Sequence, residues 1–279
     1  MTRVSDLLPP LDTAFLDELT KIVSRAAAAI LAIPRSDLSQ RTKPDLSPVT
    51  NADHASDAII AEGLSQLLPG LQIVSEERHE QISPPLGHET FALVDPLDGT
   101  KEFIAGRDEF TVNLALIRRG RPVAGLIAAP ARGLLYRGAE GWGAQRLRLA
   151  PGQGPEASRE TISLHTRAAQ EDGLVATISR SHLDPATAAF LSRYRVARQI
   201  ASGSSLKFCL LAEGAADLYP RLGRTSEWDV AAGDAVLSAA GGIVTLVEGK
   251  SLVYGAHSSF HIPAFIAWGD PALARSTAS

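Results

Sequence analysis

The chain has 279 residues, of which 45% are hydrophobic and 21% are charged, and its formal net charge at pH 7 is −4. This length is enough for one large or two moderate domains around a sizeable core. No apolar run approaches the roughly 18 residues that a membrane span requires. The acidic balance, with a pI near 6.0, argues against a general nucleic-acid binder, which would carry a basic surface. The single cysteine, Cys209, cannot form an internal disulfide, and the N-terminal stretch is acidic, so we expect a cytoplasmic protein without a secretory signal.

Helical and β-rich patterns follow one another in the first half of the chain. Apolar residues recur at spacings of three and four between Asp12 and Pro34, which predicts a helix. After a polar stretch expected to be a loop, a second helix is predicted to begin near Asn51 or Asp53, either of which could be its N-cap, and to end at residues 69–70. Apolar, β-branched runs predict strands at residues 71–74, 91–94, 110–117, 123–129, 134–137 and 142–147.

A segment rich in glycine, proline and serine, residues 151–158, interrupts this order. We place a boundary there and expect an α+β part over residues 1–157, which carries most of the candidate metal ligands, and an α/β part over residues 158–279. In the second part, strands are expected at residues 174–178, 196–200, 216–219, 243–247 and 265–268, and helices at residues 185–194, 205–213 and 228–240.

The most informative stretch is Asp95-Pro96-Leu97-Asp98-Gly99-Thr100, which follows the predicted strand at 91–94. Two carboxylates three residues apart supply the oxygen ligands that hard cations prefer. Pro96 stiffens the turn, and Gly99 lets the backbone approach a ligand, so the amides of Gly99 and Thr100 could contact an oxyanion. Taken alone, an acid pair of this kind is also common in ordinary turns.

Three further segments make the pattern specific: residues 47–53, which precede a predicted helix, Ser75-Glu76-Glu77 after a strand, and Trp228-Asp229 at the start of a helix. Together with the D-P-L-D-G-T stretch, they resemble the inositol monophosphatase superfamily. Residues 203–208 and 218–221 resemble, within it, the 3′(2′),5′-bisphosphate nucleotidases of the CysQ type. The resemblance runs from about Thr42 to Asp234. It implies a layered α/β/α/β/α sandwich of the inositol monophosphatase and fructose-1,6-bisphosphatase type.

The same resemblance implies a site with two or three Mg²⁺ ions. The implied metal ligands are the side chains of Glu76, Asp95, Asp98 and Asp229 and the carbonyl of Leu97, with Glu77 just outside them. Asp53 and Thr100 would position and help to deprotonate the attacking water. The implied substrate contacts are Gly99, Thr100, His182, Ser204, Ser205, Lys207, Arg221 and Asp229. Local readings stay open beside these roles, because Asp229 could be a helix N-cap, Lys207 a solvated lysine and His182 a capping or surface residue.

The expected activity is magnesium-dependent, lithium-sensitive hydrolysis of the 3′-phosphate of adenosine 3′,5′-bisphosphate to AMP, and of its sulfated precursor, in support of sulfate assimilation. Lys207 and Arg221 would hold the phosphate that is not cleaved. The alternative enzyme is an inositol monophosphatase. A regulator that binds anionic ligands without turnover is a third possibility, against which the complete set of acids argues. The resemblance leaves open whether the chain is a monomer or a homodimer and whether it associates peripherally with the cytoplasmic face of the inner membrane.

Overall fold

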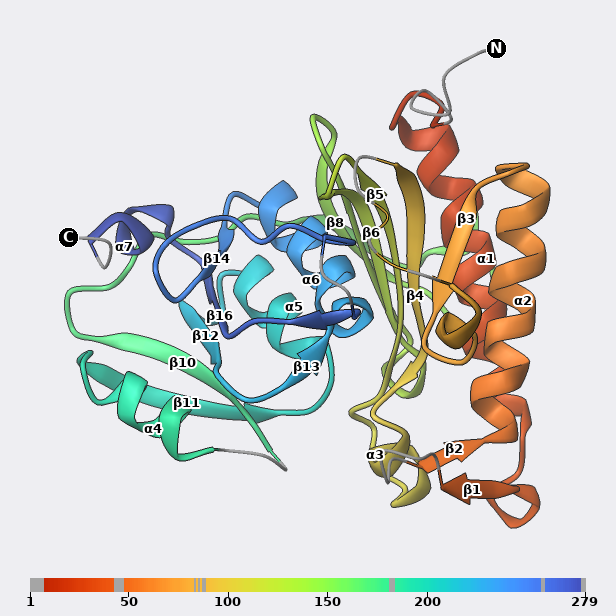
Figure 1. The fold of residues 1–279 in the computed structure, drawn as a ribbon, viewed down its shortest axis with the longest axis horizontal. Helices are drawn as coiled ribbons and strands as arrows, with labels where there is room; N and C mark the ends of the chain where they lie inside the picture. Colours follow the sequence, from red (N-terminus) through yellow and green to blue (C-terminus); the bar gives the residue numbers. More distant parts are fainter. Residues whose placement is uncertain are drawn as a thin grey trace.

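The computed structural model describes residues 8–42, 48–82, 84, 86, 89–180, 184–256 and 259–276. Two β-sheets and their helices form five layers (Figure 1). Helices α1 and α2 cover the outer face of the larger sheet, α5 and α6 lie between the two sheets, and α4 and α7 cover the outer face of the smaller sheet. The predicted α/β/α/β/α architecture is therefore confirmed.

The larger sheet has seven strands that follow the chain from one edge to the other, in the order β3-β4-β5-β6-β7-β8-β9. Only β3 and β4 are parallel, and the other neighbours are antiparallel. The bounds are β3 (Gln72–Ser75), β4 (Thr90–Asp98), β5 (Thr111–Arg118), β6 (Arg121–Ala129), β7 (Leu134–Ala139), β8 (Gly143–Arg148) and β9 (Thr161–Ser163). The sequence did not predict β9, because its three exposed residues, with one apolar residue among them, are too few for a strand pattern.

The smaller sheet is mixed, with the order β11-β10-β12-β16-β14. Its strands are β10 (Leu174–Ser179), β11 (Val196–Ser202), β12 (Leu218–Arg221), β14 (Ile243–Leu246) and β16 (Phe265–Trp268). Two short pairs complete the strands, β1 (Gln40–Thr42) with β2 (Pro48–Thr50) and β13 (Thr225–Ser226) with β15 (His261–Ile262). The expectation of a loop without regular structure before residue 48 was therefore wrong where β1 forms.

Seven α-helices are described, of which α3 and α7 were not predicted because they are too short for a periodic pattern. They are α1 (Thr13–Ala32), α2 (Asn51–Leu67), α3 (Thr100–Ile104), α4 (Pro185–Leu191), α5 (Leu206–Ala212), α6 (Glu227–Ala239) and α7 (Pro271–Ser276). None of the helices in the described ranges is long and apolar enough to cross a lipid bilayer.

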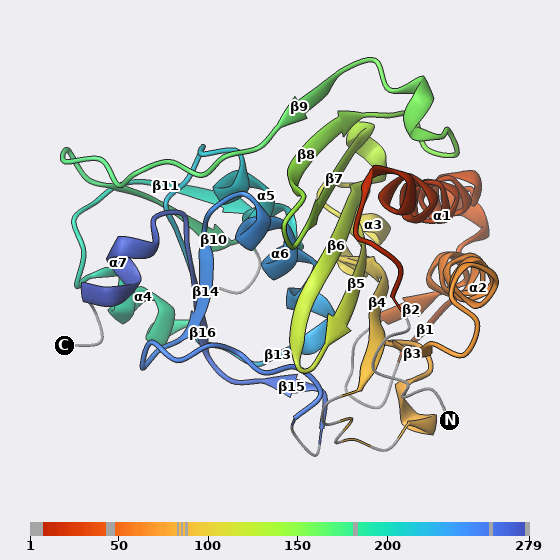
Figure 2. The same ribbon diagram turned by 90° about the horizontal axis from the view of Figure 1, so that it is seen from above.

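Helix α6 packs very closely against the middle of the larger sheet (Figure 2). Gly125 in β6 and Gly138 in β7 make this possible. A Cβ atom at Gly125 would lie 2.5 Å from the carbonyl oxygen of Ala232, and one at Gly138 would lie 3.0 Å from the Cα atom of Val236. The buried face of α6 continues into a core that includes residues of both sheets. Because α6 also begins beside the acid-rich stretch, this packing sets where its first turn lies.

The chain passes from the larger to the smaller sheet between β9 and β10. A division of the chain at residue 157 remains a proposal, because β9, which follows residue 157, belongs to the larger sheet, and α6 from the second half packs on that sheet.

We expect Gly125→Ala to lower the free energy of unfolding by about 1 to 3 kcal/mol, the usual effect of overpacking a tight core. The added methyl group meets backbone rather than a flexible side chain, so α6 or β6 must shift. Urea unfolding measures the change. The matched control is Gly223→Ala, whose Cβ would meet its nearest atom at 3.4 Å and should leave stability unchanged or slightly higher. Equal losses in both variants would contradict the close approach of α6.

Candidate active site

The acid-rich stretch forms the end of β4 and the start of α3. Strand β4 continues through Asp98 beside β5, with a break in the register between Asp95 and Asp98. The expectation that the strand ends before Asp95 was therefore wrong. Gly99 has a φ of 91°, in the left-handed region, and a Cβ there would collide with Ser204 Oγ. Gly99 is thus required both for the backbone turn and for the approach of the chain around Ser204.

Three carboxylates from different elements meet beside this turn. Ligand oxygens of Glu76, Asp95 and Asp229 all lie within 4.8 Å of one another, an arrangement that could hold a metal ion. Glu76 follows β3, Asp95 lies in β4, and Asp229 lies in the first turn of α6. The structure thus brings together three of the four predicted acidic ligands from residues up to 153 positions apart in the sequence.

The environment of these carboxylates disfavours their charged form. Burial raises the pKa of Asp95 well above its usual value, and repulsion from Glu76, Asp98 and Asp229 raises it further. Burial, followed by repulsion from Glu76, also raises the pKa of Asp229. Such a cluster gains stability from a bound cation, which offsets the repulsion between the carboxylates.

Asp98, the fourth predicted acid, lies next to this cluster and is held by neutral donors. Its Oδ2 accepts hydrogen bonds from Ser205 Oγ at 3.2 Å, from Asn113 Nδ2 at 3.3 Å and from Thr111 Oγ1 at 3.4 Å. Burial, and then repulsion from Asp229, raises the pKa of Asp98 to about 6. Sequence reasoning missed Thr111 and Asn113, because both lie inside a strand whose pattern only indicated a buried core.

Asp53 and Asp229 occupy equivalent positions, each at the third residue of a helix. The N-caps are Thr50 for α2 and Ser226 for α6, so the reading of Asn51, Asp53 or Asp229 as an N-cap was wrong. Asp53 Oδ2 accepts from the Thr50 amide at 2.8 Å, and Asp229 Oδ2 accepts from the Ser226 amide at 2.9 Å. In each case one carboxylate oxygen closes the capping box, which leaves the other oxygen for a different partner.

The second oxygen of Asp53 connects it to Thr100. Thr100 Oγ1 lies 3.0 Å from Asp53 Oδ1 and 3.1 Å from the carbonyl oxygen of Leu97, so its single hydrogen can be donated to either of them. Asp53 and Thr100, which were predicted to act together on the attacking water, are therefore adjacent, and the carbonyl of Leu97, a predicted metal ligand, lies beside Thr100. Glu77 lies beside Glu76, and its amide donates to Ser75 Oγ at 3.3 Å.

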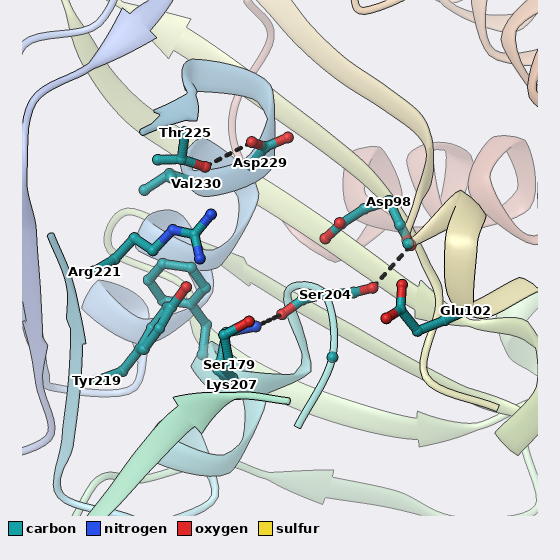
Figure 3. Close-up of a pocket in the computed structure, with 13 residues that line it drawn as sticks. Asp98, Glu102, Ser179, Ser204, Lys207, Tyr219, Arg221, Thr225, Asp229 and Val230 are labelled. Atoms are coloured by element: carbon teal, nitrogen blue, oxygen red, sulfur yellow. Dashed lines mark hydrogen bonds between the residues drawn. The ribbon is translucent and has the colours of Figure 1, made fainter. Parts of the chain in front are cut away.

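A pocket opens next to the acids, between the two sheets (Figure 3). Asp98 and Asp229 lie on its wall together with Gly99, while Tyr219, Arg221 and Lys207 come from the elements of the smaller sheet and α5. Glu102 and Ser179 also line this pocket and were not predicted to do so. Glu102 lies two residues after Thr100, where the sequence indicated a turn residue outside the metal ligands rather than a pocket wall.

The predicted phosphate contacts differ in how much of their hydrogen-bonding capacity is already used. Lys207 is 5% exposed, and its Nζ donates to the carbonyl oxygens of Ser204 at 2.6 Å and Ser202 at 3.4 Å. Burial lowers its pKa to about 8, although the charge of Asp98 opposes this. Ser205 Oγ is 3.0 Å from the carbonyl oxygen of Asp229 as well as near Asp98. Lys207 and Ser205 thus hold the turn at residues 203–205 in place.

Arg221 retains donors for a ligand. Its Nη2 donates to the carbonyl oxygen of Arg224 at 3.2 Å, and its Nε is buried out of reach of a ligand. Its Nη1 makes no hydrogen bond to any of the described residues, and the side chain lines the pocket. Its charge lowers the pKa of Asp229, which places the guanidinium within electrostatic reach of the acids. His182, the remaining predicted contact, lies outside the described residues.

Comparisons with known proteins agree with this geometry. The model of the inositol monophosphatase family matches residues 14–275. A 3′(2′),5′-bisphosphate nucleotidase CysQ from Escherichia coli K12 is 39% identical over 254 residues, which are 90% of this chain and 98% of that protein. The protein of the same name from Buchnera aphidicola is 37% identical over an alignment that covers 87% of this chain and 88% of that protein.

Solved structures show the same fold. The crystal structure of CysQ from Bacteroides thetaiotaomicron, 32% identical, superposes with a TM-score of 0.74 and covers 93% of this chain and 98% of its own. Inositol monophosphatase II from Staphylococcus aureus, at 20% identity, superposes with a TM-score of 0.74 over 96% and 95% of the two chains, which is a likeness of fold alone. The layered fold, the gathered acids and the match over nearly the whole length show that this chain belongs to the inositol monophosphatase family.

Proposed function

We propose that this chain is a magnesium-dependent phosphatase that removes the 3′-phosphate of adenosine 3′,5′-bisphosphate, and also acts on its sulfated precursor. The observation that carries the proposal is the presence of two features in one pocket, acids of a cluster able to hold metal and the guanidinium of Arg221. The curated relatives named 3′(2′),5′-bisphosphate nucleotidase, similar over nearly the whole chain, support this substrate class.

The residues of the cluster fit Mg²⁺ better than a soft metal. Glu76, Asp95, Asp98 and Asp229 offer carboxylate oxygens, Leu97 offers a carbonyl oxygen, and no cysteine or histidine belongs to the described cluster. The repulsion that raises the pKa of Asp95 would be relieved by a bound cation. Two or three ions at this site would neutralise the phosphate and lower the pKa of a bound water.

The chain's own proton acceptor would be Asp53. Thr100 lies between Asp53 Oδ1 and the Leu97 carbonyl, so a water held at Thr100 Oγ1 can release a proton through the hydroxyl to the carboxylate. A threonine hydroxyl is too weak a base to act without such a partner. The capping bonds from Thr50 fix the other oxygen of Asp53 and so orient the carboxylate.

The phosphate that is not cleaved would lie towards Arg221. Its guanidinium matches a phosphate in shape and charge, and Lys207 adds positive charge from beneath the turn. Gly99, Ser204 and the other predicted contacts would shape the pocket around the nucleotide. A side-by-side phosphate-release assay with adenosine 3′,5′-bisphosphate and inositol 1-phosphate tests the proposal directly. If the enzyme preferred inositol 1-phosphate, the proposed nucleotidase activity would be wrong and the alternative, an inositol monophosphatase, would be favoured.

We expect the stability of the metal-free protein to fall as pH rises from about 4 towards 7. Asp95, Asp98 and Asp229 have raised pKa values when folded, so the unfolded chain loses its protons first and is favoured as the pH increases. Mg²⁺ at about 100 times its Kd should add about 2.7 kcal/mol near pH 7 and much less near pH 5, where protons compete for the carboxylates. Urea unfolding with EDTA and with Mg²⁺ at both pH values measures this, and an equal gain at the two pH values would contradict the metal assignment.

Asp98→Asn should reduce turnover by about 100-fold or more while the protein stays folded, because a lost metal ligand costs several kcal/mol of transition-state stabilisation. Asparagine keeps an oxygen for the donors around Asp98, so circular dichroism should be unchanged. The matched control is Asp172→Asn, a change at an exposed aspartate before β10, which should retain parent activity. Activity of the Asp98 variant within about tenfold of the parent would remove Asp98 from the set of ligands.

Arg221→Ala should lower kcat/KM for adenosine 3′,5′-bisphosphate by about 1.5 to 3 kcal/mol, the range of a hydrogen bond to a charged group. Hydrolysis of adenosine 3′-monophosphate should change little, because it lacks the second phosphate. Arg224→Ala, at the exposed neighbour, is the control. Lys207→Ala is expected to affect both substrates, since it also removes the bonds to Ser202 and Ser204. If Arg221→Ala slowed both substrates equally, the guanidinium would serve the cleavage site or the fold.

A further inference from the structure

Glu109 joins the two halves of the molecule immediately behind the pocket. It lies in the loop between α3 and β5 and is 7% exposed. Arg180, the residue after β10, binds both of its oxygens, with Nε 2.6 Å from Oε2 and Nη2 2.8 Å from Oε1. The amide of Gly203, after β11, donates to Oε2 at 3.1 Å. The Glu109 carboxylate, which lies next to the larger sheet, thus binds residues at the ends of β10 and β11, two neighbouring strands of the smaller sheet.

The turn at residues 203–205 depends on being held in this way. Ser204 has a φ of 48°, a left-handed conformation that is unfavourable for a residue other than glycine. Its Oγ lies 2.8 Å from the carbonyl oxygen of Glu109 and 2.9 Å from that of Asp98. A Cβ at Gly203 would lie 2.8 Å from the same Glu109 oxygen. The turn is therefore pressed directly against Glu109 and the end of β4.

Both sides of this contact form the wall of the pocket. Asp98 and Gly99 line it from β4, and Gly203, Ser204 and Lys207 line it from the turn and α5. Glu109 and Arg180 do not line the pocket themselves. The hydrogen bonds from Arg180, and then the charges of Arg180 and Arg132, lower the pKa of Glu109, so the carboxylate stays ionised and the pair stays charged.

We infer that Glu109 and Arg180 are positioning residues for substrate binding, which fix the separation of the two pocket walls. This inference rests on the proposed function. The pair acts on the turn at residues 203–205, which also contacts Asp98 through Ser204 and Ser205. The other three proposed acidic ligands, Glu76, Asp95 and Asp229, are carried by other elements. Loss of the pair therefore weakens substrate binding more than it slows the chemical step.

A second ion pair in the chain has the same geometry but lies away from the pocket. Arg167 binds Asp217 through Nε at 2.7 Å and Nη2 at 2.8 Å, and the amide of Val175 donates to the same carboxylate at 2.7 Å. Asp217 is fully buried. Removal of Arg167 thus reproduces the loss of a bidentate arginine from a buried carboxylate without touching the pocket wall, and it serves as the matched control.

The two possible roles of the pair give different kinetics. A purely structural pair, when lost, reduces the fraction of folded enzyme, which lowers kcat and leaves KM unchanged. A positioning pair, when lost, displaces a pocket wall and raises KM. Displacement of a binding group by about 1 Å can cost up to about 100-fold, so the effect on KM is large enough to separate the roles.

The experiment compares Arg180→Ala, Arg180→Lys and Arg167→Ala with the parent, using adenosine 3′,5′-bisphosphate and saturating Mg²⁺, with urea unfolding of each. We expect Arg180→Ala to raise KM about tenfold or more and to change kcat by less than about threefold. Arg180→Lys, which can keep one contact, should be intermediate. Arg167→Ala should keep the parent KM, although its stability also falls.

A parent-like KM in Arg180→Ala, or an equal rise in KM in Arg167→Ala, overturns the inference about Glu109 and Arg180. Either result leaves the proposed function untouched. If Arg180→Ala does not fold, Arg180→Lys and Glu109→Gln decide in the same assay, and a parent-like KM in both overturns it. A parent enzyme that does not hydrolyse the bisphosphate overturns the proposed function, and the inference with it. The parent rate and the ratio of variant to parent KM therefore separate the two failures.

Discussion

Mutual repulsion between buried carboxylates is the constraint around which this structure is built. Glu76, Asp95 and Asp229 place ligand oxygens within 4.8 Å of one another, and burial together with like charge raises the pKa of Asp95 and Asp229. Nothing in the carboxylates themselves favours this arrangement. It exists because β3, β4 and α6 are held together by a shared core, whose packing energy offsets the repulsion.

The helix that supplies Asp229 shows how the core and the site depend on each other. Gly125 and Gly138 let α6 approach the sheet so closely that its first turn reaches the acids of β4. On its opposite side, α6 packs against α5. A displacement of α6 would therefore change both the core and the separation of the carboxylates, so the stability of the fold and the geometry of the site are not independent quantities.

The sequence predicted most elements because their signals are local, whereas the order of the layers was implied by the resemblance to the superfamily. Periodic apolar residues identified α1 and the strands of the larger sheet, and glycine and proline marked where they end. The acids were found because they sit in short recognisable stretches, and the structure gathers Glu76, Asp95 and Asp229 into one cluster. Their roles as ligands, like those of Asp53, Thr100 and Arg221, remain proposals.

What the sequence missed depends on contacts between distant residues. Thr111 and Asn113 read as core strand positions, yet they hold Asp98. Glu109 has no motif around it, and its role follows from contacts with Arg180 and Gly203, which lie 71 and 94 positions away, and from an ion pair with Arg132. The sequence also gave no sign that Lys207 Nζ supports the carbonyl oxygens of a turn, while its role towards a phosphate stays a proposal. No local pattern encodes such partners.

The shared design of Asp53 and Asp229 has a consequence for how mutational data on this chain should be read. Each carboxylate divides its two oxygens between closing the first turn of a helix and facing the site. An alanine at either position would both weaken the start of the helix and remove a charge from the site, so the measured loss of activity would contain both effects. Asparagine keeps one acceptor for the cap, while it removes the charge and replaces the other oxygen with an NH2 group. Large-scale alanine scans would therefore overstate the chemical role of both residues, and the difference between the alanine and asparagine variants would give the energy of helix initiation at each site.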